Sequence, residues 1–194
     1  PGGHHHRRGT PIGPFRPAQG GPARRSTVKN NSFLAVSPGI YREDSGMVYE
    51  DYVPGEVVEH RPGRTITMTD NVWSSLLCLN QHPLHIDAVY AEQTPFGKIV
   101  VSSLVTFGIV NGMTVSTISA KCVANLGWDK VRLTAPVFVG DTLYAQTRIV
   151  SRRESETRPE QGIVTVHTTG RNQDDVPVIE FERTILVPKQ GAEQ

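Results

Sequence analysis

The stretch "IVVSSLVTFGIVNGMTVSTISA", residues 99–120, lies between Lys98 and Lys121 and carries no charged residue over 22 positions. A run of that length could cross a bilayer. Only twelve of its residues are apolar, however, and the other ten are Ser, Thr, Gly or Asn, which makes insertion into a membrane unfavourable. We therefore predict a long helix that is buried on most of its faces inside a soluble domain.

The period of the apolar residues changes after this run. Apolar and polar residues alternate in four segments, which is the pattern of half-buried strands. The segments are 131–137, 143–149, 162–170 and 177–188, and the last one places Ile179, Phe181, Ile185 and Val187 on one face. A long apolar helix followed by such strands predicts an α+β domain in which one antiparallel sheet wraps around the central helix.

Three segments upstream of the run also have recognisable patterns. Residues 56–68, "EVVEHRPGRTITM", predict a strand or strand pair at the edge of the sheet. Residues 69–80, "TDNVWSSLLCLN", predict a helix capped by Thr69 or Asp70. Residues 87–93 predict a second short helix, capped by Asp87. The expected apolar stripe of the 69–80 helix consists of Val72, Trp73, Leu76 and Leu77.

Charge and composition divide the chain into a tail and one domain. Residues 1–31 hold six Lys or Arg, no Asp or Glu, and many Gly and Pro, so they cannot bury enough apolar surface to fold. We predict a disordered segment at 1–35, one domain at 36–189 and a short tail at 190–194. After residue 31, fourteen basic and nineteen acidic residues give a net charge of −5, which argues against a nucleic-acid-binding surface.

The two cysteines, Cys78 and Cys122, lie among apolar residues and lack a CxxC spacing. This pattern is typical of buried, reduced thiols, so we expect a cytoplasmic protein.

The segment "NQHPLHIDAVYA", residues 80–91, is the best candidate for chemistry. His82 and His85 are three residues apart around a proline, unlike the two histidines of an HExxH helix, and no cysteine or acidic cluster completes a zinc site. We therefore predict no metal. His85 can accept and return protons near neutral pH. Asn80 cannot act as a base, although its amide can hold a water molecule.

Three segments resemble, in order, signature regions of the MaoC-like hydratase/dehydratase family, which has the hot-dog fold. They are "NQHPLHIDAVYAEQTPFGKIVVSSL" (80–104), "VRLTAPVFVGDTL" (131–143) and "FERTILVP" (181–188), and the resemblance covers about residues 48–188. It implies a single hot-dog domain that hydrates an enoyl-CoA, or dehydrates a 3-hydroxyacyl-CoA, with no cofactor besides the CoA of its substrate.

The sequence departs from the usual family motif, which has an Asp followed by Asn-Pro-x-His. Asn80 stands at the Asp position and His82 at the Asn position, while Pro83 and His85 match. The family's His-Gly pair before the long helix is replaced by Val101 and Ser102. Together with "HRPGRTITMTDN" (60–71), these changes resemble a branch linked to branched C5 dicarboxylyl-CoA substrates such as mesaconyl-CoA and itaconyl-CoA.

The resemblance implies a site in which His85 moves protons and Asn80 holds water. Backbone N–H groups near Ser102 and Ser103 would bind the thioester oxygen at the start of the helix. The chain could approach the ligand closely at Gly97, and His82 would line the substrate. Purely structural roles stay open: Asn80 fits a helix C-cap, His82 fits a hydrogen-bonding or packing contact in the loop, and Ser102 and Ser103 fit positions that need small residues for close packing. Asp70 is the reserve carboxylate.

Two other functions stay open, a hot-dog thioesterase and a non-catalytic protein that binds acyl thioesters. A single hot-dog unit has an open sheet edge and half of a substrate tunnel, so we expect a homodimer or a dimer of dimers with acyl-CoA at the interface. No nucleic-acid or membrane partner is expected. Candidate contacts for phosphate or carboxylate groups are Arg64, Lys130, Arg132, Arg152 and Arg153.

Overall fold

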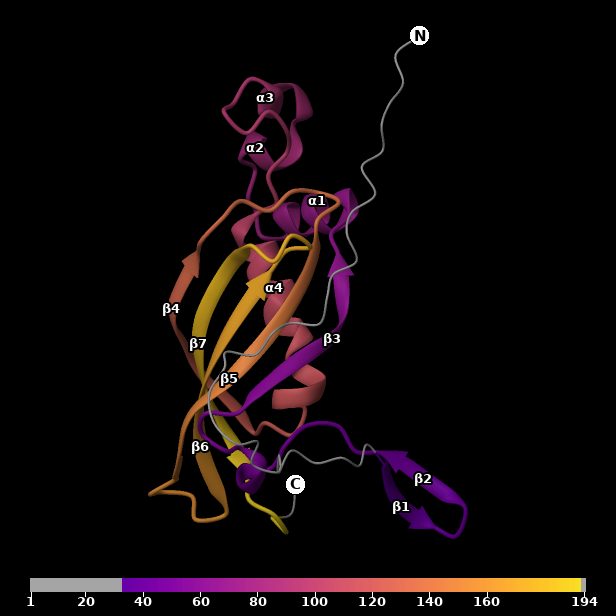
Figure 1. Ribbon diagram of the computed structural model, residues 1–194, viewed down its shortest axis with the longest axis vertical. Coiled ribbons are helices and arrows are strands. Elements are labelled where there is room, and N and C mark those ends of the chain that lie inside the picture. Colours follow the sequence, from indigo (N-terminus) through magenta and orange to yellow (C-terminus); the bar gives the residue numbers. More distant parts are fainter. Residues whose placement is uncertain (1–32, 193–194) are drawn as a thin grey trace.

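The computed structural model describes residues 33–192, so the predicted disorder of the N-terminal segment lies almost entirely outside the described residues. Its last residues do not fit that prediction, because residues 33–35 belong to strand β1 (Phe33–Ser37). This strand pairs with β2 (Ile40–Glu43) in a hairpin that projects away from the rest of the fold (Figure 1).

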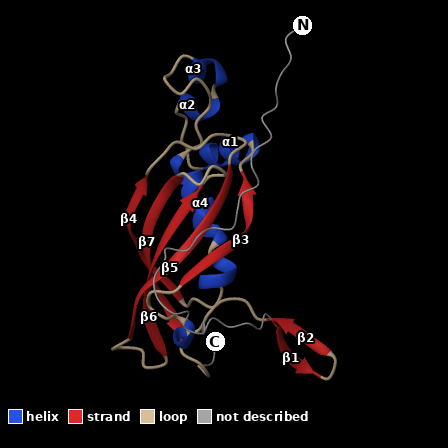
Figure 2. Cartoon of the chain, viewed as in Figure 1, coloured by secondary structure: helices blue, strands red, loops and turns tan. Residues whose placement is uncertain are grey.

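A five-stranded antiparallel sheet forms the body of the domain, in the order β3-β5-β6-β7-β4. The strands are β3 (Val57–Thr65), β4 (Ala124–Leu133), β5 (Thr142–Glu154), β6 (Gln161–Arg171) and β7 (Pro177–Pro188). Strand β3 lies at one edge, as the sequence predicts, and β4 lies at the other. The sheet curves around helix α4 (Ser103–Met113), which confirms the predicted α+β architecture (Figures 1 and 2).

Helix α4 is shorter than the uncharged run that predicts it. The backbone before it is extended, with Val100 bridging Phe138 and the Val101 N–H donating to the Val137 carbonyl at 2.8 Å. These strand contacts delay the start of the helix until Ser102, its N-cap. After Met113 the chain continues into the π-helical turn η2 (Val115–Ser119). No helix within residues 33–192 has the length and hydropathy needed to cross a bilayer.

The core lies between α4 and the inner face of the sheet. The side chains of Ile179, Phe181, Ile185 and Val187 are fully buried, as the alternation in that segment predicts. Gly170 on β6 lies directly against helix α4. A Cβ atom there would lie 2.7 Å from a Val110 methyl carbon, so only glycine fits without a shift of the helix.

Helix α1 (Met68–Leu77) differs most from its prediction. Thr67 caps it instead of Thr69 or Asp70. Its buried residues are polar, Asn71 and Ser75, whereas most of the predicted apolar stripe faces outward, with Trp73 66% and Leu77 74% exposed.

The remaining helices are short. The 3-10 turn η1 (Tyr49–Asp51) precedes the sheet, and helices α2 (Pro83–Ile86) and α3 (Ala88–Glu92) follow α1.

The two cysteines differ from the prediction of buried thiols. Cys78 ends α1 as its C-cap and is exposed, and Cys122 is half-buried, so that prediction is wrong.

Candidate active site

The candidate motif lies in the segment that carries α2 and α3, which extends past the sheet at the N-terminal end of α4 (Figure 1). Helix α1 leads into it through a Schellman ending. Leu79 adopts a left-handed conformation with φ of 57°, its N–H bonds the Leu76 carbonyl at 3.0 Å, and the Asn80 N–H bonds the Ser75 carbonyl at 2.8 Å. Asn80 therefore closes the helix with its backbone and keeps its side chain for other contacts.

The imidazole of His85 has a defined orientation and tautomer. Its Nδ1 lies 2.8 Å from the carbonyl oxygen of Val100. Because a carbonyl only accepts hydrogen bonds, the neutral form of the ring carries its proton on Nδ1 and presents a lone pair at Nε2. No other described residue hydrogen-bonds to Nε2, so this nitrogen is available to take a proton.

The side chain of Asn80 reaches the same extended segment. Its Nδ2 donates to Ser102 Oγ at 3.3 Å, and its Oδ1 accepts from the His82 N–H at 3.2 Å. One amide hydrogen and one oxygen lone pair remain for another partner. Asn80 and His85 are thus both fixed against residues 100–102, just before α4.

The start of α4 offers fewer free N–H groups than predicted. The Ser102 N–H donates to Asn71 Oδ1 at 2.9 Å, so it is already engaged. The N–H groups of Ser103 and Leu104 form no hydrogen bond to any residue in the described range. Because the helix dipole also favours negative charge there, these two groups are the better candidates for an oxyanion site.

Asn71 is absent from the set of site residues that the sequence predicts. It is fully buried, and besides accepting from Ser102 it donates from Nδ2 to the His85 carbonyl at 2.8 Å. The available signal was weak: Asn71 and Ser75 are four residues apart, on one face of a helix. The apolar stripe on the other side of the helix is the stronger signal, so the sequence pattern predicts that the stripe, and not Asn71 and Ser75, is buried.

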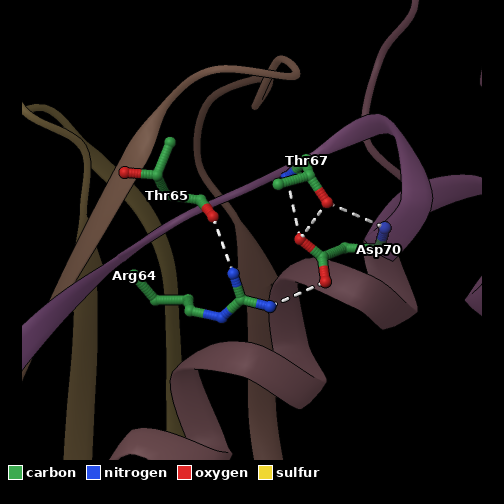
Figure 3. Close-up of polar contacts among 4 residues, drawn as sticks. All are labelled: Arg64, Thr65, Thr67 and Asp70. Carbon is green, nitrogen blue, oxygen red and sulfur yellow. Dashed lines mark hydrogen bonds and ion pairs between the residues drawn. The ribbon is translucent and has the colours of Figure 1, made fainter.

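Asp70, the reserve carboxylate, is the third helical residue of α1 and completes the capping box with the N-cap Thr67. The backbone N–H and hydroxyl of Thr67 donate to its Oδ2 at 2.8 and 2.7 Å, and Arg64 donates to its Oδ1 at 2.7 Å (Figure 3). Arg64 also bonds the Thr65 carbonyl. The Thr67 hydrogen bonds, aided by Arg64, lower the pKa of Asp70, so it stays ionised and ties α1 to β3.

The other predicted residues lie around this centre. His82 caps α2, with Nδ1 accepting from the Leu84 N–H at 3.2 Å, and its ring centroid is 5.9 Å from that of His85. Asp87 caps α3 through the Tyr90 N–H, as predicted. Gly97 has φ of 67° in a turn, and open space surrounds the position of a Cβ atom there.

A small groove opens between α1 and α4. Its volume is about 170 Å³, and it is lined by Asp70, Ser74, Cys78, Leu104, Val105, Gly108 and Ile109. Pockets that enclose drug-sized ligands usually measure about 300–1,000 Å³. The lining reaches the first turn of α4 but excludes Asn80 and His85. Among residues 33–192, no group of three or more His, Cys, Asp or Glu is placed to hold a metal ion.

Comparison with known proteins matches residues 51–172 to a family model described as MaoC like domain. The mesaconyl-CoA hydratase of Cereibacter sphaeroides and the beta-methylmalyl-CoA dehydratase of Chloroflexus aurantiacus are each 32% identical over 149 residues. These matches cover 77% of this chain but only 43% and 42% of the relatives, so the chain spans less than half of their length.

Solved structures agree with this result. A MaoC domain protein dehydratase from Chloroflexus aurantiacus superposes with a TM-score of 0.71 at 33% identity, over 76% of this chain and 42% of the other. A Mycobacterium tuberculosis protein described as having a double hot-dog fold gives a TM-score of 0.69 at 21% identity, over 77% and 46% of the two chains. The hot-dog fold predicted from the sequence is therefore confirmed.

Proposed function

The chain belongs to the MaoC-like domain family, and from this we propose that it forms an acyl-CoA hydratase or dehydratase site. The reaction adds water across the 2,3 bond of an enoyl-CoA, or removes it from a 3-hydroxyacyl-CoA. The observation that carries the proposal is the free Nε2 of His85. The contact of Nδ1 with the Val100 carbonyl holds the ring at the N-terminal end of α4, and this end presents unpaired N–H groups.

In the hydration direction, His85 Nε2 takes a proton from a water molecule as the water oxygen bonds to carbon 3. The double-bond electrons move toward the thioester, and the N–H groups of Ser103 and Leu104 stabilise the enolate oxygen. Protonated His85 then gives its proton to carbon 2, which restores the neutral imidazole. Only proton transfer and hydrogen bonding are needed, so we propose that no cofactor takes part.

Asn80 replaces the carboxylate of the usual motif, and we propose that it orients the water. The amide hydrogen and lone pair that remain after its contacts with Ser102 and His82 can bind one water molecule as donor and acceptor. Because Asn80 cannot move a proton, His85 carries both proton transfers.

For the substrate class we propose a branched C5 dicarboxylyl-CoA, such as mesaconyl-CoA or itaconyl-CoA. Support comes from the two relatives at 32% identity, whose names specify mesaconyl-CoA and beta-methylmalyl-CoA.

We also propose that a second hot-dog unit completes the site. The edge strand β4 exposes large apolar side chains: Leu126, Trp128, Val131 and Leu133. The groove beside α4 is smaller than pockets that enclose drug-sized ligands, and the match covers less than half of the two relatives at 32% identity. A second copy of this chain, as a homodimer or a dimer of dimers, would cover this edge and complete the binding space for CoA.

We propose a cytoplasmic location. The free thiols of Cys78 and Cys122 support it.

A combined assay tests the function. Absorbance of the enoyl thioester is followed together with release of free thiol, using crotonyl-, mesaconyl- and itaconyl-CoA. A hydratase changes the absorbance without releasing thiol, a thioesterase releases thiol, and a binding protein does neither. His85→Ala should lower turnover by about 10²–10⁴-fold. His167→Ala, on the outer face of β6, is the matched control and should keep full turnover. Equal rates in the two variants would refute the role of His85.

A further inference from the structure

The side chain of Asn71 joins the two elements that carry the proposed site. Its Nδ2 donates to the main-chain carbonyl of His85 at 2.8 Å, and its Oδ1 accepts from the N–H of Ser102 at 2.9 Å. The first contact holds the His85 loop, and the second holds the N-cap of α4. One planar amide thus sets the spacing between the imidazole and the helix end.

Because Asn71 is buried, removing its two hydrogen bonds would destabilise the folded protein. The residue has no exposed surface, and a buried polar group left without a partner destabilises the folded protein. Removing the side chain would strand both the His85 carbonyl and the Ser102 N–H. Ser75, one turn further along the same buried face, differs in this respect, because its hydroxyl is buried without a hydrogen-bond partner in the described chain.

We propose that Asn71 is a positioning residue of this site: it fixes the His85 loop against the start of α4 and, by engaging the Ser102 N–H, directs the thioester oxygen to the N–H groups of Ser103 and Leu104. The inference rests on the proposed function, since positioning has meaning only for a reaction at His85. Displacing a reacting group by about 1 Å can cost on the order of 100-fold in rate.

Two variants and one control test the proposal. Asn71→Ala removes both contacts. Asn71→Asp keeps an acceptor for the Ser102 N–H, at a helix end that favours negative charge, and removes the donor to His85. Ser75→Ala is the matched control, because it alters the same buried face without touching the bridge.

The first measurement is nuclear magnetic resonance of ¹⁵N-histidine-labelled protein, with the His85 signals identified by their loss in His85→Gln. In the unaltered protein we expect the proton on Nδ1. In both Asn71 variants we expect a mixture of tautomers, because the ring is no longer held on the Val100 carbonyl, whereas Ser75→Ala keeps the single tautomer. An unchanged His85 signal in both folded Asn71 variants would overturn the proposal, whatever the enzyme's activity.

The second measurement is turnover of the CoA thioesters, at a temperature where thermal melts show each variant folded. We expect kcat to fall about 10- to 100-fold in the Asn71 variants with KM little changed, and Ser75→Ala to keep its rate. A loss of stability with normal kcat would reduce Asn71 to a structural residue. If the unaltered chain turns over none of the thioesters, the proposed function fails, while the tautomer measurement still reports whether Asn71 positions His85.

Discussion

The imidazole of His60 on β3 and the hydroxyl of Thr147 on β5 meet inside the domain, with Nε2 2.7 Å from Oγ1. The other ring nitrogen lies 2.7 Å from the hydroxyl of Thr117 in η2, and Thr147 continues the chain of contacts to Thr168 on β6 at 2.8 Å. His60 is 1% exposed. Burial, with a smaller effect from Arg61, lowers the pKa of His60 to about 4, so the ring is neutral in the folded protein at neutral pH.

This pKa predicts how stability depends on pH. An unfolded histidine titrates near 6.5, so between about pH 4 and 6.5 the unfolded chain binds more protons at this site than the folded chain. The contribution of His60 is therefore fully present above about pH 6.5 and is lost as the pH falls toward 4, by about 3 kcal/mol at most. Urea unfolding at pH 7 and pH 5 measures it. We expect His60→Gln to flatten this dependence and His167→Gln to preserve it; equal slopes in the two variants would contradict the assignment.

Leu79 predicts a stabilising substitution. It is a bulky residue with φ of 57°, and it is 82% exposed. The left-handed backbone is therefore strained, and little packing within the described chain offsets that strain. Leu79→Gly should raise the free energy of unfolding by about 1 kcal/mol, because glycine adopts this conformation without strain. Chemical denaturation checks this, with Leu77→Gly, in the last turn of α1, as a control that should destabilise. A loss of stability in Leu79→Gly would show that the leucine makes a contact that offsets its strain.

The contrast between α1 and β7 explains what could be predicted from the sequence. Strand alternation in β7 placed Ile179 and Phe181 in the core because each inward position packs against one continuous surface, α4. In α1 the same logic failed: the polar residue Asn71 is buried since it bonds two segments distant in the sequence, the His85 loop and Ser102. Such a bridge has no local signature.

The candidate site also combines features with a local sequence pattern and features that depend on distant segments. The pattern around Pro83 predicts His85 as the proton carrier, since an imidazole beside that turn is a local feature. The loss of the Ser102 N–H as a free donor could not be predicted, because its partner lies 31 residues away. The start of α4 could not be predicted either, because residues 99–102 are as uncharged as the helix itself. Contacts with segments distant in the sequence, among them Val137 and Phe138, keep these residues extended.

The cap of α1 gives a direct test of structure against pattern. Thr67 and Asp70 form a reciprocal capping box, with the Asp70 N–H donating to Thr67 Oγ1 at 3.2 Å, whereas the sequence favours Thr69 or Asp70 as the cap. Thr67→Ala should therefore lower the free energy of unfolding by about 1 kcal/mol. Thr69→Ala, inside the first turn, should change it by less than about 0.5 kcal/mol. Thermal or urea unfolding of both variants decides between them, and a larger loss at Thr69 would support the pattern over the structure.

Arg183 on β7 predicts a strong difference between two basic side chains. It is 7% exposed, donates from Nε to Asn125 at 2.6 Å and from one terminal nitrogen to Ser119 at 3.1 Å, and so links β7, β4 and η2. Lysine keeps the charge but cannot reproduce this planar set of donors. Arg183→Lys should therefore lower the free energy of unfolding by about 2 kcal/mol, since hydrogen bonds from a charged group are each worth about 1.5–3 kcal/mol.

The matched control is Arg132→Lys on β4, where the arginine is exposed and lies 3.9 Å from Glu180. A surface ion pair of this kind contributes about 0–1 kcal/mol, so this variant should unfold almost as the unaltered protein does. Urea denaturation at one pH measures both variants. If Arg183→Lys were as stable as Arg132→Lys, the three-way link would contribute little, and the apolar packing around η2 would be sufficient to hold β4, β7 and the end of α4 together.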